Sequence, residues 1–258
     1  MFEPVAMGSG PSGLADWPRP FVFRAIHLDG RTIQAGEAFH FDLNLFDTKP
    51  DAVAYLVLAF TQLAREGLGP ERSRVELTGV WHLDINGNAA GPAFPQVPAP
   101  LELDLTATEQ ITRIRVQFLT PTELKSGQQL AARPEFGILA ARIRDRISTL
   151  RELYGDGPLD IDFRAFGERA AQVRLMRCDV RQVDIVRRSS RTGQVHSIGG
   201  FVGEAEYEGE LAEFVPYIRA GRWTGVGRQT VWGKGVIGNL CHNCSPKGFP
   251  LFSAHHRI

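Results

Sequence analysis

The chain has 258 residues, of which 43% are hydrophobic, so it can form one large domain or two small domains with packed cores. It contains no apolar run long enough to cross a bilayer and no charged-then-apolar N-terminus. Three cysteines are too few for a disulfide framework, and together these features favour a cytoplasmic protein. The formal net charge is zero, so binding of a polyanion would depend on local clusters of basic residues.

The N-terminal part of the chain predicts a flexible leader followed by a strand–helix–strand unit. Residues 1–19 are rich in Gly, Ser and Pro and predict no regular structure. The patterns that follow predict strands over 21–27 and 39–45, a helix from Pro50 to about Arg65 that stops at Gly67, and a strand over 74–84. The Pro-rich run from 91 to 100 predicts a loop or linker.

The second half of the chain repeats this pattern. Alternating apolar residues predict a strand over 111–118, and a helical stripe predicts a helix over 134–154. A long strand over 172–186, a hairpin loop, a strand over 198–207, a helix around 211–220 and a last strand at 236–237 follow. We therefore predict an α+β protein with two tandem ferredoxin-like (RRM-like) halves, at 20–105 and 106–240, and a tail at 241–258.

Positive charge is concentrated in the strand and hairpin between residues 174 and 191. This stretch holds six arginines and two aspartates, a net charge of +4. Arginine stacks on bases and binds phosphates in a bidentate manner, so the stretch predicts an RNA contact. The arginines concerned at the hairpin are Arg187, Arg188 and Arg191. The alternative interpretation is a solvated strand edge.

Residues 225–235, with the sequence GVGRQTVWGKG, form a glycine-rich loop with two Gly-x-Gly pairs around five residues. Glycines allow positive φ angles and can leave peptide N–H groups exposed to phosphate oxygens. Basic side chains add charge, and an indole offers a stacking surface. The spacing does not fit a P-loop, and a tight β-hairpin is the alternative. The predicted RNA contacts in this loop are Gly225, Gly227, Arg228, Trp232, Gly233, Lys234 and Gly235.

The segment from Gly199 to Gly235 resembles the C-terminal end of the CRISPR RNA-processing endoribonucleases of the RAMP superfamily. The resemblance rests on a strand that begins at Gly199-Gly200, a short helix, and the glycine-rich loop. In this loop, Lys234 stands where an apolar or aromatic residue is more usual in the family. The segment 118–125, the helix at 134–154 and the unit at 36–69 are also similar to parts of these proteins. The resemblance implies that RNA contacts the glycine-rich loop, and Lys125 is a further predicted phosphate ligand.

The resemblance also implies a chemistry. These enzymes are similar to metal-independent ribonucleases, in which the ribose 2′-OH attacks its own 3′ phosphate and leaves a 2′,3′-cyclic phosphate and a 5′-OH. The reaction needs a base, an acid and a cation, and histidine suits the first two roles. The candidate catalytic residues are His196, His40 and His27. Family members often place a histidine in or after the first helix, or just before the glycine-rich loop; residues 47–73 contain none, and Thr224 precedes the loop here.

Two further features leave alternatives open. Cys241 and Cys244 make half a zinc site that His255 and His256 could complete, but reduced thiols are the preferred interpretation, and no metal or cofactor is predicted.

The leading hypothesis is an endoribonuclease acting on CRISPR repeat RNA. The alternatives are a non-catalytic RAMP subunit that binds guide RNA in an effector complex, and a small-molecule enzyme on the same fold. Other CRISPR effector subunits and a second copy of the chain are candidate partners, and no membrane contact is expected.

Overall fold

The computed structural model describes residues 17–69, 71–96, 99–107, 110–188, 193 and 195–241. By their contacts the described residues form two compact units, one made of those within 1–44 and 105–258 and the other of those within 45–104. The sequence placed residues 20–44 in the N-terminal half, whereas the structure groups them with the C-terminal half. No helix within the described ranges has the length and apolar character that a bilayer-spanning segment needs.

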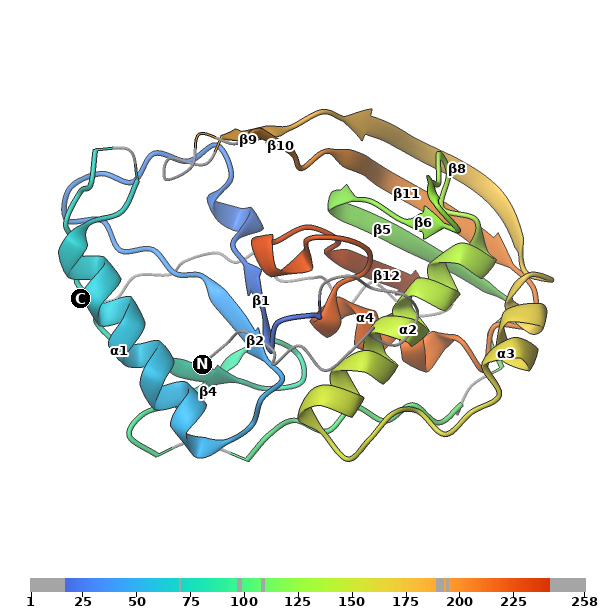
Figure 1. Cartoon of the computed structure of the whole chain (residues 1–258), viewed down its shortest axis with the longest axis horizontal. Helices are drawn as coiled ribbons and strands as arrows, with labels where there is room; N and C mark the ends of the chain where they lie inside the picture. The colour runs from blue at the N-terminus through green and yellow to red at the C-terminus, as the bar shows by residue number, and fades with distance from the viewer. Residues whose placement is uncertain are drawn as a thin grey trace. The chain divides into compact units, whose positions relative to one another are not determined.

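The larger unit contains a four-stranded antiparallel sheet in the order β12-β5-β11-β8. Its strands are β5 (Arg113–Thr122), β8 (Arg174–Val183), β11 (Gly200–Glu208) and β12 (Ile237–Cys241). The helices α2 (Phe136–Tyr154), α3 (Phe163–Ala170) and α4 (Val215–Thr224) belong with this sheet (Figure 1). The connection β5-α2-β8-β11-α4-β12 with this strand order is the ferredoxin-like arrangement that the sequence predicted, and the expected α+β class is confirmed.

The core of this unit lies between the helices and one face of the sheet. Alternate residues of the central strands are buried, as the period of two in their sequences predicts. Phe136 of α2 packs edge-on against Tyr207 of β11 at 5.0 Å and Phe214 at 5.3 Å, which fixes α2 over the sheet. The Tyr207 hydroxyl donates to the Pro134 carbonyl at 2.7 Å, so the buried ring also has a polar partner.

The opposite face of the sheet carries charged side chains in cross-strand pairs. Arg113 of β5 and Arg174 of β8 both pair with Glu208 of β11, and Arg115 pairs with Glu206. RNA-binding sheets of the RRM type stack bases on aromatic side chains. The described positions on this face of β5, β8 and β11 hold no aromatic residue. Four of the arginines on this face, Arg113, Arg115, Arg174 and Arg177, are paired with carboxylates.

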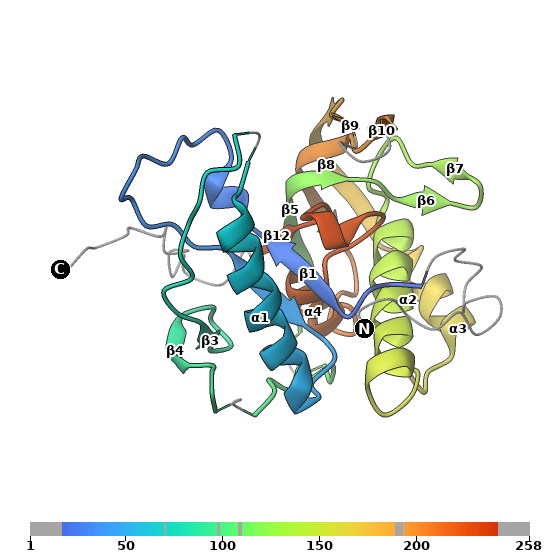
Figure 2. The same ribbon diagram turned by 60° about the vertical axis from the view of Figure 1, so that its left-hand side comes forward.

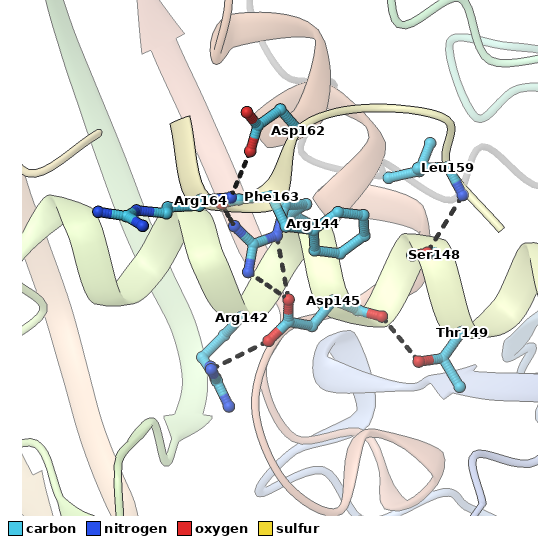
Figure 3. A network of polar contacts seen from close by, with 9 residues as sticks. All are labelled: Arg142, Arg144, Asp145, Ser148, Thr149, Leu159, Asp162, Phe163 and Arg164. Carbon is cyan, nitrogen blue, oxygen red and sulfur yellow. Dashed lines mark hydrogen bonds and ion pairs between the residues drawn. The ribbon is translucent and has the colours of Figure 1, made fainter. Parts of the chain in front are cut away.

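The short helix α3 was not predicted from the sequence. Asp162 caps its N-terminus by accepting from the backbone N–H groups of Arg164 and Ala165 at 2.9 and 3.0 Å. The buried Arg144 of α2 donates to the Phe163 carbonyl at 2.8 Å and to the Asp145 carboxylate at 2.6 Å (Figure 3). Its guanidinium also lies 4.5 Å from the Phe163 ring centroid. These contacts attach α3 to α2.

The remaining elements of the larger unit are short. They are β1 (Phe21–Arg24), the 3-10 turn η2 (Ile26–Leu28), β2 (Asp42–Leu45), β6 (Lys125–Ser126), β7 (Gln129–Leu130), β9 (Val186–Arg188), β10 (Val195–Ser197) and the 3-10 turn η3 (Thr230–Trp232). Strand β1 pairs with β2, β6 with β7, and β9 with β10. Figure 2 shows β6 and β7 as a hairpin that follows the end of β5.

The smaller unit contains one helix and one hairpin. Helix α1 (Pro50–Glu66) begins with a proline and ends at Gly67, which has a φ of 96°, as the sequence predicted. Strands β3 (Trp81–Leu83) and β4 (Ala89–Pro92) form the hairpin. The strand predicted over 74–84 is therefore shorter in the structure.

Candidate functional site

The glycine-rich loop connects α4 to β12 and folds back onto the end of β5. The Val226 N–H donates to the Gly235 carbonyl at 2.9 Å and closes the base of the loop. The Gly235 N–H donates to the Pro121 carbonyl at 3.1 Å, and the Arg228 N–H donates to the Glu123 carbonyl at 3.2 Å. A Cβ on Gly235 would lie 1.9 Å from the Val226 carbonyl oxygen, so the backbones approach too closely for any other residue.

These hydrogen bonds change the expected role of the loop backbone. The sequence suggested that the loop exposes its peptide N–H groups to phosphate. In the structure many of these groups donate to backbone carbonyls of the protein, including those of Gly225, Val226, Arg228, Trp232, Gly233 and Gly235. Any phosphate contact made by this loop therefore depends more on its side chains than the sequence suggested.

The two cations of the loop meet the same carboxylate. An Arg228 Nη1 atom lies 2.6 Å from Glu123 Oε1, and the Lys234 Nζ atom lies 3.6 Å from Glu123 Oε2. The Arg228 side chain is 51% exposed, whereas that of Lys234 is 4% exposed and also donates to the Gln229 side chain. Burial lowers the pKa of Lys234 from its ordinary value. Arg228 is thus placed to reach a ligand, and Lys234 is not exposed to one in this conformation.

The loop begins where helix α4 ends, and polar side chains hold that end. Arg24 donates to the carbonyls of Arg222 and Trp223 at 3.0 and 3.3 Å. Asn44 donates to the Trp223 carbonyl at 2.7 Å. Arg146 of α2 donates to the Thr224 carbonyl at 2.7 Å. The last carbonyls of a helix lack intrahelical partners, so these cations and the amide satisfy groups that would otherwise be unpaired.

Burial of the two arginines has an electrostatic cost. Desolvation lowers the pKa of Arg24 to about 10, partly offset by Asp42, and lowers the pKa of Arg146 to about 9. Both guanidinium groups nevertheless donate hydrogen bonds at this position and fix the start of the loop.

Sequence reasoning missed Arg24, Asn44, Arg146 and Glu123, because their partners lie far away in the chain. The only sequence signal was Glu123, an acid within the segment that resembled the family.

His27 and His40, two of the three predicted catalytic residues, lie together. Their rings stack with centroids 4.3 Å apart and an angle of 21° between the planes. The His27 Nε2 atom lies 2.8 Å from the His40 backbone carbonyl oxygen. Since a carbonyl oxygen only accepts, Nε2 of His27 carries the proton in this contact. The 3-10 turn η2 supplies His27, and the residues before β2 supply His40, so the β1–β2 pairing brings the two histidines together.

The histidine pair has a charged neighbour. Burial raises the pKa of Asp42, while electrostatic interactions with His40, His27 and Arg24 act in the opposite direction. Strand β1, which carries Arg24, also contacts η3 in the glycine-rich loop. One continuous set of contacts within the larger unit therefore connects the histidine pair, Arg24, the end of α4 and the loop.

The other predicted residues occupy separate places. His196 lies in β10 and pairs in register with Arg187 of β9, and Arg188 pairs with Val195. Lys125 begins β6 and lies two residues after Glu123 in the sequence. Trp232 is 47% exposed in η3. Arg191, Cys244, His255 and His256 lie outside the described residues, and Cys241 ends β12. The RNA-binding and catalytic roles of all these residues stay predictions.

A groove of about 310 Å³ lies beside the glycine-rich loop. Its wall includes Glu123, the partner of Arg228, and the end of the β6–β7 hairpin. The lining residues are Thr122, Glu123, Leu130, Ala131, Ala132, Gln182, Asp184, Gly199, Gly200 and Phe201. The Gly199-Gly200 pair that carried part of the family resemblance therefore forms part of a concave surface.

Comparisons with known proteins agree with the geometry. Residues 116–237 match the family model of the CRISPR-associated endoribonuclease Cas6, and residues 1–97 match a model described as an N-terminal domain. No curated protein matches the chain. Among solved structures, the product complex of Cas6 (TTHB231) from Thermus thermophilus matches with a TM-score of 0.56 and 18% identity, over 86% of this chain and 81% of that chain. The product complex of a second Thermus protein, Cas6 (TTHA0078), matches with a TM-score of 0.51 and 19% identity, over 86% and 83%.

Proposed function

We propose that the chain cuts CRISPR repeat RNA within precursor transcripts, because residues 116–237 match the family model of the CRISPR-associated endoribonuclease Cas6. The observation that carries this proposal is the stacked pair of His27 and His40. The pair lies in the compact unit that contains the family-matching segment. Strand β1 and Arg24 link it to the glycine-rich loop, where Arg228 is half-exposed.

We assign to the pair the two proton transfers of a metal-independent cleavage. One neutral imidazole accepts the proton of the ribose 2′-OH, and the 2′ oxygen attacks the adjacent phosphorus. The bond from phosphorus to the 5′ oxygen breaks, and a protonated imidazole donates its proton to that leaving oxygen. The products are a 2′,3′-cyclic phosphate and a 5′-OH. Arg228 stabilises the negative charge of the phosphorane.

His27 and His40 are better supported in this role than His196. Two imidazoles in contact can supply one base and one acid, which is what the reaction requires. His196 lies in the β9–β10 hairpin, whose register pairs it with Arg187 and with no second histidine. His196 stays the third candidate and belongs in the same mutational series.

The test is cleavage of labelled CRISPR repeat RNA in EDTA, beside a copy with a 2′-deoxy ribose at the cut site. We expect the wild-type protein to cut the first RNA and not the second. His27→Ala and His40→Ala should each slow cleavage by about 10² to 10⁴ fold, the contribution typical of a general acid or base, while RNA affinity stays close to wild type.

A matched control is His82→Ala, which removes a histidine from β3 in the smaller unit and should cut at the wild-type rate. Wild-type cleavage by both His27→Ala and His40→Ala would refute the assignment and move attention to His196. Tight RNA binding without any cut by the wild-type protein would instead favour a subunit that only holds guide RNA.

A further inference from the structure

The groove beside the glycine-rich loop, here called the Glu123 groove, has an apolar side and a polar side. Leu130, Ala131 and Ala132 come from the segment after the β6–β7 turn, and Leu130 is 57% exposed. Gln182 and Asp184, at the end of β8, are exposed and polar. A planar group with apolar faces and a polar edge fits such a surface.

Two glycines keep the base of the groove open. A Cβ on Gly199 would lie 2.5 Å from the Val183 carbonyl oxygen, and a Cβ on Gly200 would lie 2.6 Å from the Thr122 carbonyl oxygen. Gly200 also has a φ of 151°, a backbone conformation that residues with a side chain rarely adopt. The ends of β5, β8 and β11 therefore meet backbone to backbone here, and this part of the groove has no side chain that could fill it.

A cation stands at the edge of the groove. Arg228 pairs with Glu123, a lining residue, and its side chain is 51% exposed. If Arg228 turns to a phosphate, the Glu123 carboxylate still faces the Lys234 ammonium, whose Nζ atom lies 3.6 Å away. Glu123 is then not left as a buried charge without a partner, which makes the exchange of Arg228 from carboxylate to phosphate inexpensive.

The polar edge restricts the ligand further. A carboxylate at Asp184 accepts hydrogen bonds, and the Gln182 amide both donates and accepts. Nucleobases present ring N–H or amino donors together with carbonyl or ring-nitrogen acceptors, which match this set. A phosphate on Arg228 and a base in the groove are parts of the same nucleotide, and only an unpaired base can turn its edge into a groove.

We propose that the Glu123 groove binds one unpaired nucleotide of the RNA, with its base between the Leu130 and Asp184 sides and a phosphate on Arg228. The inference rests on the proposed function, because it takes the ligand to be part of the repeat RNA. It adds a specific subsite for the base, next to the phosphate that Arg228 holds, and this subsite reads one single-stranded position.

The experiment fills the groove and removes bases from the RNA. Ala132→Trp places an indole in the groove from an exposed position, so the fold is expected to survive. The matched control is Ala171→Trp, the same substitution at an exposed residue beside the start of β8, whereas the groove lies beside the end of that strand. The probe is repeat RNA with a 2′-deoxy ribose at the cut site and one abasic nucleotide at each unpaired position in turn, measured by fluorescence anisotropy.

We expect one unpaired position at which loss of the base weakens wild-type binding roughly tenfold, in the range of one stacked base. Ala132→Trp should bind intact RNA with a similar loss and should show no additional loss at that abasic position. Ala171→Trp should behave as wild type. The proposal is overturned if Ala132→Trp binds intact RNA like wild type, or if the abasic profiles of Ala132→Trp and wild type coincide. If wild type binds no repeat RNA, the proposed function itself fails, and the subsite fails with it.

Discussion

Glu123 places a negative charge against the cations that the RNA phosphate would need. The sequence predicted that Arg228 and Lys234 both contact RNA, since each is basic and each lies in the glycine-rich loop. The structure pairs both with one carboxylate and buries Lys234. The difference arises because Glu123 precedes the loop by about a hundred residues, and composition alone does not reveal which acid a base will meet.

We predict that Glu123→Gln increases RNA affinity and lowers stability. The amide releases Arg228 from an exposed ion pair, worth about 0 to 1 kcal/mol, so the Kd should fall by up to about fivefold at low salt. Lys234 loses the carboxylate beside its buried ammonium, so the midpoint of thermal unfolding should fall. Anisotropy titrations and thermal unfolding measure the two effects.

The control is Glu37→Gln, which removes an exposed partner of Arg31 at 2.7 Å and should change neither quantity appreciably. A weaker affinity in Glu123→Gln would contradict the prediction. It would mean that the carboxylate positions Arg228 for RNA rather than competing with it.

At the scale of elements, the glycine-rich loop depends on close backbone contact more than on turn conformation alone. Gly235 and Gly30 have nearly the same positive φ, 66° and 68°. An added Cβ at Gly235 would collide with the Val226 carbonyl, whereas nothing lies within 4 Å of one at Gly30. Comparing the same substitution at the two positions separates the cost of the collision from the cost of the backbone conformation.

We predict that Gly30→Ala lowers the free energy of unfolding by about 1 kcal/mol, the cost of a positive φ for alanine. Gly235→Ala should lower it by several kcal/mol more, because the loop must open to relieve the collision, and it should also weaken RNA binding. Urea unfolding followed by circular dichroism measures both. Equal losses in the two variants would show that the loop tolerates the extra carbon by a small shift.

The difference between local conformation and contact with distant segments also explains which elements were predicted from the sequence. Helices α1 and α2 have long apolar stripes, and their predicted ranges agree with Pro50–Glu66 and Phe136–Tyr154. Helix α3 has eight residues, and its attachment through Arg144 depends on a contact between segments, so periodicity did not reveal it. The loop was predicted as a feature, but its partners are the carbonyls of Pro121 in β5 and of Glu123 just after that strand, and local patterns do not identify such distant partners.

At the scale of the whole molecule, the structure groups residues 20–44 with the ferredoxin-like domain. Strand periods predicted strands near β1 and β2, but local periodicity does not encode tertiary pairing, so it could not indicate which compact unit these strands join. This grouping brings His27 and His40 into the unit of the glycine-rich loop. The histidine pair and the glycine-rich loop were therefore each predicted separately, and their location in one compact unit was not.

Charge on the whole molecule gives the last prediction. The chain has 29 basic and 29 acidic residues, and three arginines of the sheet face, Arg113, Arg115 and Arg174, are paired with Glu206 or Glu208. RNA binding should therefore neutralise few phosphates, on the order of four, and log Kd should rise with log salt concentration with a slope of about 3. Anisotropy titrations of 2′-deoxy repeat RNA from low to high potassium chloride measure this slope.

Two variants test where the phosphates bind. Arg228→Ala should reduce the salt slope by about 0.7, whereas Arg113→Ala, on the sheet face, should leave the slope unchanged. A slope near 7, reduced by Arg113→Ala, would mean that RNA displaces the sheet carboxylates and lies on that face instead of on the loop.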